Sequence, residues 1–222
     1  VIYLDADTLG FGDLSELWER ELDVAAMVAE HPSTFASPYY SIRTKHPFFI
    51  STEVNGLISG VMVISLKRLR RQPWNEELEG YRLQYDLQFH DQDLLNIYFG
   101  HHPSQLTVLS CKWNYRADHC FWERHHCNDE SNRIGILHGS RGSFHKMQDY
   151  EWAIVAFSMV FEAFKGWSIG TACEIHALVQ TKVLQWMNGV NQESQTNNCH
   201  AHALPRIIQA MASNCHRERS IV

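Results

Sequence analysis

The sequence predicts an α/β fold, because short apolar runs rich in β-prone residues alternate with longer stretches of helical length. The chain opens on V-I-Y-L (residues 1–4), a pattern typical of a strand buried on both faces in a parallel or mixed sheet. The run G-L-I-S-G-V-M-V-I-S (residues 56–65) predicts a second buried strand. Residues 150–165 are almost wholly apolar and long enough for a helix, which supplies the α part of the prediction.

The segment between the first two strands predicts two helices and a loop. Asp13 is placed to cap a short helix through residue 18. Residues 23–30 indicate a second helix. The polar stretch 31–47 contains prolines and predicts a surface loop close to a substrate.

The rest of the chain continues the alternation of helices and strands. The basic residues 67–71 begin a helix, and we interpret them as a solvated face. Residues 91–98 begin another helix, and ordinary capping would be enough to explain their aspartates. The other expected elements are strands at 106–109 and 133–137 and helices at 171–187 and 205–212.

Length and charge restrict the classes of protein to which the chain can belong. Its 222 residues, 45% of them hydrophobic, suffice for one large domain or a domain and a half. A formal net charge of −6 argues against nucleic acid as a general partner. The chain has no apolar run of about 18 residues, so we expect no segment of it to span a membrane. It has no signal peptide and no initiating Met, and it begins directly on a core strand, so we expect it to be the C-terminal portion of a longer polypeptide.

The six cysteines favour disulfide bonds in a secretory compartment over reduced thiols in the cytosol, because the number is even. Segment 120–127, which contains Cys120, His125, His126 and Cys127, raises zinc binding as an alternative. It lacks paired C-x-x-C knuckles, so we favour disulfides.

Polar groups follow two of the predicted strands, where ligands bind in α/β folds. Asp5 and Asp7 come directly after the first strand, and His138 follows the strand at 133–137. Each feature alone is weak, because aspartates also cap turns and a histidine after a strand is more often structural. Together, two carboxylates and an imidazole can bind a divalent cation and leave positions open for phosphate oxygens.

A diphosphate leaving group would use such a cation, because negative charge builds on its oxygens as the bond breaks. Gly139 and Gly142, beside the histidine, would expose backbone N–H groups to the same phosphates.

Five blocks of the sequence carry a more specific pattern. They are Y-L-D-A-D-T-L-G-F-G-D-L-S-E-L-W (3–18), S-G-V-M-V-I-S-L-K-R-L-R (59–70), D-Q-D-L-L-N-I (91–97), C-K-W-N-Y-R-A-D-H-C (111–120) and I-L-H-G-S-R-G-S-F-H (136–145). In this order they resemble the blocks of family 8 glycosyltransferases, and within that family the glucoside α-1,3-xylosyltransferases. The resemblance runs from residue 1 to about residue 165.

The resemblance implies a GT-A type nucleotide-sugar-binding fold, a mixed sheet flanked by helices, with its N-terminal part missing. Residues 1–165 would form the C-terminal part of this domain and 166–222 a helical extension. Asp91 and Gln92 would be catalytic, on the β-face of the donor sugar and close to the acceptor. The residues that would hold Mn²⁺ (or Mg²⁺) are Asp5, Asp7 and His138, and those that would bind the donor sugar and diphosphate are Ser59, Gly60, Gly139, Arg141 and Gly142.

The activity that the resemblance implies is retaining transfer of xylose from UDP-xylose to O-linked glucose on EGF-like repeats of secreted or cell-surface proteins. The full-length enzyme would be a type II membrane protein of the endoplasmic reticulum or Golgi lumen, with its membrane anchor in the missing N-terminus. Retention requires a covalent intermediate or a same-face substitution. We favour the substitution, with Gln92 stabilising positive charge, because an amide is a poor nucleophile.

Two departures from the family pattern leave alternatives open. Ile58 stands where the family has an Asn that touches the donor sugar, and Asn55 lies three residues earlier. The strands that hold uracil and ribose would precede residue 1. The chain could therefore be a catalytically impaired fragment or a non-catalytic carbohydrate-binding or scaffold derivative. The third hypothesis is an α/β domain in which Asp5, Asp7 and His138 merely cap turns.

Overall fold

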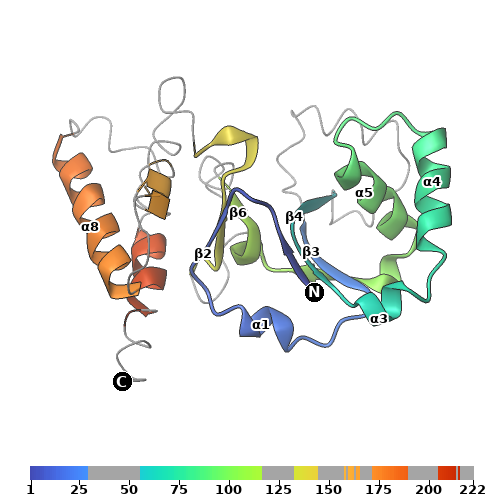
Figure 1. The fold of residues 1–222 in the computed structure, drawn as a ribbon, viewed down its shortest axis with the longest axis horizontal. Helices are drawn as coiled ribbons and strands as arrows, with labels where there is room; N and C mark the ends of the chain where they lie inside the picture. The colour runs from blue at the N-terminus through green and yellow to red at the C-terminus, as the bar shows by residue number, and fades with distance from the viewer. Residues whose placement is uncertain are drawn as a thin grey trace. The chain divides into compact units, whose positions relative to one another are not determined.

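Figure 1 shows the chain as a computed structural model. It describes residues 1–29, 56–116, 133–144, 158, 160–162, 164–165, 172–189, 205–213 and 215. The chain divides into two compact units, the first made of Val1–Asp5 and Leu14–Trp113, the second of Ala6–Asp13 and Asn114–Val222. The expected helical extension from residue 166 onward stays a prediction.

The first unit contains a mixed four-stranded sheet in the order β1-β4-β3-β5. Its central strand β4 (Leu57–Ile64) pairs antiparallel with β1 (Ile2–Leu4) and with β3 (Ala25–Ala29), and β3 pairs parallel with β5 (Leu106–Leu109). The strands expected at 1–4, 56–65 and 106–109 are therefore confirmed.

The expectation that the opening strand is buried on both faces is wrong. Val1 is 51% exposed, Tyr3 41% and Leu4 38%. Within the described part of the chain, β1 stands at one end of the sheet order, with β4 as its paired neighbour. The apolar run predicted a strand correctly, but burial depends on the elements that cover it, which a four-residue pattern does not contain.

The helix expected over residues 23–30 is also wrong, because residues 25–29 form β3. Ala and Met favour helices, but the run A-A-M-V-A offers no polar face. Between two neighbouring strands it buries every residue from Ala25 to Val28 almost completely, with exposed fractions of 3% or less. Tertiary burial therefore outweighs local propensity here.

The helices of the first unit cover its sheet. α5 (Asp91–His101) packs against β4, and α4 (Trp74–Gln84) lies beside α5 (Figure 1). Shorter helices are α1 (Ser15–Trp18) and α3 (Leu66–Leu69), and the 3₁₀ turn η2 (Pro103–Gln105) follows α5. The helices predicted near residues 13, 67 and 91 are confirmed, although the N-cap position of α1 is Leu14 rather than Asp13. The core between α5 and the sheet contains Ala25, Met27, Leu57, Met62, Leu95, Tyr98 and Phe99.

The second unit contains a three-stranded sheet in the order β2-β7-β6. β7 (Ile136–His138) pairs antiparallel with β2 (Thr8–Gly10) and parallel with β6 (Tyr115–Arg116). The strand predicted before His138 is thus present. Helix α8 (Ala172–Gly189) confirms the helix predicted at 171–187, and residues 205–213 are helical as predicted.

Disulfide bonds are present in the described part of the chain. Cys173 and Cys215 are bonded to each other, and Cys111 is also in a disulfide. These bonds agree with the preference for oxidised cysteines. The alternative zinc segment 120–127 and the loop at 31–47 lie outside the described residues.

Among the described helices, none combines the length and the apolar character that crossing a bilayer requires.

Candidate active site

In the first unit, the end of β1 lies beside the middle of β4. The Asp5 backbone N–H donates to the Gly60 carbonyl at 2.9 Å, so Asp5 extends the ladder by one residue. The Tyr3 hydroxyl donates to Asp5 Oδ1 at 2.9 Å. This hydrogen bond and the charge of Asp5 raise the pKa of Tyr3, and Asp91 raises it further. Two of the predicted carboxylates, Asp5 and Asp91, therefore act on one tyrosine.

The middle of β4 carries an irregularity that exposes its backbone to α5. Pairing with β3 shifts from Met27↔Met62 to Val28↔Ile58, so Ser59 and Gly60 have no partner in β3. Such bulges are frequent beside active sites. The Ser59 N–H and hydroxyl instead donate to Gln92 Oε1 at 3.1 and 3.3 Å. The structure thus brings together Ser59, Gly60 and Gln92.

This contact determines how the Gln92 amide is oriented. A backbone N–H can only donate, so the amide oxygen must face Ser59 and the NH₂ group must point away from it. Gln92 was expected to stabilise positive charge, but its amide oxygen is engaged by the strand. One turn later, Asn96 bonds both the N–H of Leu57, at 2.7 Å, and its carbonyl, at 3.0 Å. Sequence reasoning missed Asn96, because an Asn inside a helix carries no local signal of a distant strand.

The start of α5 is held by Asp93 rather than by Asp91. Asp93 is 2% exposed, and its Oδ2 accepts the N–H groups of Gln88 and Phe89 at 2.6 and 2.7 Å. His90, which follows, has φ 51°, a conformation that is uncommon for a residue with a side chain. Backbone strain of this kind clusters at functional sites. His90 directly precedes Asp91 and Gln92 in the chain, and the Asp91 side chain is exposed.

In the second unit, Asp7 and His138 face one another. Asp7 Oδ1 is 3.3 Å from His138 Nε2, and the Gly139 N–H donates to the Asp7 carbonyl at 2.7 Å. The other ring nitrogen of His138, Nδ1, is 2.7 Å from Asn114 Oδ1. His138 is 5% exposed and Asn114 is fully buried, so these groups are screened from water. Asn114 appears in the quoted block W-N-Y-R but was not predicted as a site residue.

Asp5 and Asp7 are separated by one residue in the chain, which keeps their side chains in the same neighbourhood. In a group of possible metal ligands formed with His138, ligand atoms of Asp5 and Asp7 lie within 4.8 Å of each other. Carboxylate oxygens suit Mg²⁺ and Mn²⁺, and a neutral imidazole is a common metal ligand. The donor set therefore fits the cation that the sequence predicts.

Two glycines follow His138, and packing or backbone conformation explains why each position is a glycine. A Cβ on Gly139 would overlap the ring carbons of Phe144, so this position needs glycine for packing. Because the Gly139 N–H bonds Asp7, the expectation that it is exposed to a phosphate is wrong. Gly142 has φ 72°, which glycine adopts without strain. The backbone of Arg141 lies in the 3₁₀ turn η4 (Ser140–Gly142).

Ile58, the apolar departure from the family pattern, is 2% exposed in β4 and belongs to the core. Asn55 lies outside the described residues.

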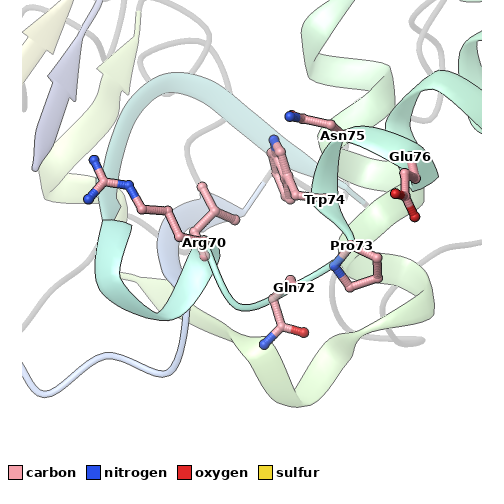
Figure 2. A pocket seen from close by; sticks show the side chains of 7 residues that line it. Arg70, Gln72, Pro73, Trp74, Asn75 and Glu76 are labelled. Carbon is pink, nitrogen blue, oxygen red and sulfur yellow. The ribbon is translucent and has the colours of Figure 1, made fainter.

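A separate pocket of about 390 Å³ lies at the turn between α3 and α4 (Figure 2). It is lined by Leu69, Arg70, Gln72, Pro73, Trp74, Asn75 and Glu76, so no predicted site residue contributes to it.

Comparison with known proteins decides the family. Residues 1–138 match the family model described as glycosyl transferase family 8, which is more than half of the chain. The chain belongs to glycosyltransferase family 8. The recognition of the sequence blocks is thereby confirmed.

Curated relatives in this family include glucoside xylosyltransferase 1 of Gallus gallus, 33% identical over 188 residues, and glucoside xylosyltransferase 2 of Xenopus laevis, 36% identical over 163 residues. The alignments cover 77% and 65% of this chain but 41% and 38% of the relatives. The chain thus spans about two fifths of the length of these family 8 proteins.

A solved structure supports the fold. The galactosyltransferase LgtC, crystallised with donor and acceptor sugar analogues, matches with a TM-score of 0.51 and 22% identity, covering 71% of this chain and 59% of LgtC. The predicted GT-A type α/β fold with mixed sheets flanked by helices is confirmed for this family 8 chain.

Proposed function

We propose that this chain is part of a retaining glycosyltransferase that moves xylose from UDP-xylose to O-linked glucose on EGF-like repeats. The observation that carries the proposal is the pairing of Asp7 with His138, next to Asp5, in a family 8 chain. Similarity to glucoside xylosyltransferases supports the donor and the acceptor. The disulfide Cys173–Cys215 supports the lumen of the endoplasmic reticulum or Golgi as the working compartment.

In the proposed site, Asp5, Asp7 and His138 hold Mn²⁺ or Mg²⁺. When bound, the cation stabilises the negative charge that builds on the diphosphate oxygens. Arg141 and the backbone of Gly142 bind the diphosphate. Gly139 contributes by bonding Asp7 through its N–H, which fixes the backbone between the metal ligands.

The remaining candidates act on the donor sugar. Ser59 and Gly60 line the sugar, and the NH₂ group of Gln92 donates to a sugar hydroxyl, because its oxygen is bonded to Ser59. The exposed carboxylate of Asp91 stabilises positive charge at the anomeric carbon. In a same-face substitution, the bond from this carbon to the phosphate oxygen breaks while a bond to the acceptor oxygen forms. The acceptor attacks from the face that the phosphate leaves, so the configuration is retained, and the acceptor proton passes to the leaving phosphate.

The decisive experiment measures transfer from a panel of UDP-sugars to an O-glucosylated EGF-like repeat, with and without Mn²⁺. It uses this chain and a version extended toward the N-terminus, because the alignments cover only 41% and 38% of the two curated relatives. We expect UDP-xylose to be the preferred donor and Asp7→Asn to lower the rate by about 100-fold or more. The matched control is Glu19→Gln, an exposed carboxylate outside the site, which should keep the parent rate.

A non-catalytic carbohydrate-binding derivative is the second candidate, and the apolar, buried Ile58 favours it because this side chain offers no hydrogen bond to a sugar. It predicts that the glucosylated repeat binds to both versions while neither transfers sugar from any donor. This result would contradict the transferase proposal.

A further inference from the structure

We propose that Asn114 is a positioning residue that holds His138 in the tautomer with hydrogen on Nδ1, so that the Nε2 lone pair faces Asp7. This role of Asn114 matters for metal binding because His138 is a metal ligand in the proposed function, and to that extent it rests on that proposal. It begins from two distances, 2.7 Å between His138 Nδ1 and Asn114 Oδ1, and 3.3 Å between His138 Nε2 and Asp7 Oδ1.

The chemistry of the amide determines the proton position. In the orientation of the Asn114 amide that the structure shows, the amide oxygen faces His138 Nδ1 at 2.7 Å. An amide oxygen accepts hydrogen bonds and has no hydrogen to donate, so in this orientation Nδ1 carries the hydrogen. A neutral imidazole has a single N–H, which leaves Nε2 with a lone pair. Histidines that bind metals almost always donate their other N–H in this way to a carbonyl or carboxylate.

Backbone pairing on both sides of β7 fixes the two partners of His138. β6 pairs Arg116 with His138, which places Asn114 just before this pairing begins. β2 pairs Thr8 with His138 and is preceded by Asp7. The ring therefore lies between an acceptor that orients it and the carboxylate that it faces.

Asn114 is buried together with its neighbours in the chain. Asn114 lies between Trp113 and Tyr115, and the three residues are at most 2% exposed. Within the described residues, Asn114 Nδ2 is buried without a hydrogen-bond partner. If the amide were turned by 180°, Nδ2 would donate to His138 Nδ1 and the ring hydrogen would move to Nε2. The two orientations thus predict opposite tautomers, which spectroscopy distinguishes.

The test is a long-range ¹H–¹⁵N correlation spectrum of protein labelled at its histidine ring nitrogens, recorded without metal at a pH where the ring is neutral. His138→Gln identifies the His138 signals by their disappearance. We expect Nδ1 to carry the hydrogen in the wild type. Asn114→Leu, which cannot accept, should allow the Nε2–H form, and Asn114→Asp, whose carboxylate still accepts, should preserve Nδ1–H.

An Nε2–H signal in the wild type would overturn the proposal, even if the Leu variant failed to fold. An unchanged tautomer in folded Asn114→Leu would overturn it as well. Titration with Mn²⁺, followed by electron paramagnetic resonance, gives the separate readout. We expect the affinity to fall about 10- to 100-fold in Asn114→Leu and to recover in Asn114→Asp. Absence of Mn²⁺ binding in the wild type with Nδ1–H present would contradict the metal site of the proposed function and leave the role of Asn114 intact.

Discussion

Individual residues of the candidate site combine chemistry with packing. Gly139 is an example, because its N–H bonds Asp7 and its missing side chain leaves room for the Phe144 ring. That ring stacks on Phe161 with centroids 5.0 Å apart, which limits its freedom to move. The sequence predicted Gly139 as a site residue. The packing reason for a glycine there became visible only once the structure placed the Phe144 ring beside it.

Gly139→Ala is predicted to destabilise the second unit by about 1–3 kcal/mol, because the new methyl group overlaps the Phe144 ring. Chemical denaturation monitored by circular dichroism measures the loss. Gly10→Ala in β2 is the matched control, since a Cβ there meets nothing within 4 Å. Adding Phe144→Leu to the Gly139→Ala variant should recover part of the loss, and equal stabilities of both alanine variants would contradict the argument.

At the scale of elements, side chains of one element complete the hydrogen bonding of another. Gln92 and Asn96 of α5 satisfy the backbone of β4 around its irregularity. α4 is joined to the end of α5 by side chains alone, because Glu77 Oε2 of α4 is 2.7 Å from Nε2 of His102, the residue after α5, and also accepts from the Tyr81 hydroxyl within α4. The periodicity predicted α5, but only the assembled sheet shows which of its polar residues are structural.

The contact between α4 and α5 is predicted to weaken in acid. Burial alone would raise the pKa of Glu77, but its hydrogen bonds with His102 and Tyr81 lower it below the ordinary value of 4.5. Burial, together with Glu77, raises the pKa of Tyr81 to about 12, so this hydroxyl stays a donor. A carboxyl with a lowered pKa in the folded state stabilises the fold above pH 4.5, and the stabilisation is lost as the pH falls through the lowered value.

Urea denaturation over a series of pH values tests this prediction. The free energy of unfolding should decrease more steeply below pH 4.5 in the wild type than in Glu77→Gln. Glu76→Gln, an exposed neighbour on α4, should retain the steep decrease. The same acid dependence in the wild type and in Glu77→Gln would show that the contact between Glu77 and His102 does not contribute to the pH dependence of stability.

At the scale of the whole molecule, covalent links join segments that are distant in the sequence. The disulfide between Cys173 and Cys215 closes a loop with a separation of 42 residues and connects the start of α8 to the end of the helical segment 205–213. The even number of cysteines predicted disulfides, but spacing left the pairing open, since pairing depends on which chain segments meet.

Replacing both cysteines, Cys173→Ala with Cys215→Ala, should lower the free energy of unfolding by about 2–4 kcal/mol, because the unfolded chain regains the entropy of an open loop. Thermal unfolding under non-reducing conditions measures the change. Thr181→Ala, an exposed position on α8, is the control and should shift stability by less than about 0.5 kcal/mol. A double variant as stable as the control would contradict the prediction.

The family, the α/β class and the candidates Asp5, Asp7 and His138 could be predicted before folding is considered, because these features lie in short contiguous blocks whose chemistry can be interpreted locally. The folded chain was needed to show that residues 25–29 form a strand, that Gln92 turns its oxygen to Ser59, that Asp93 holds the start of α5 and that Asn114 lies against His138. Each of these depends on a partner brought close by folding, since burial and hydrogen bonding are properties of contacts rather than of local sequence patterns.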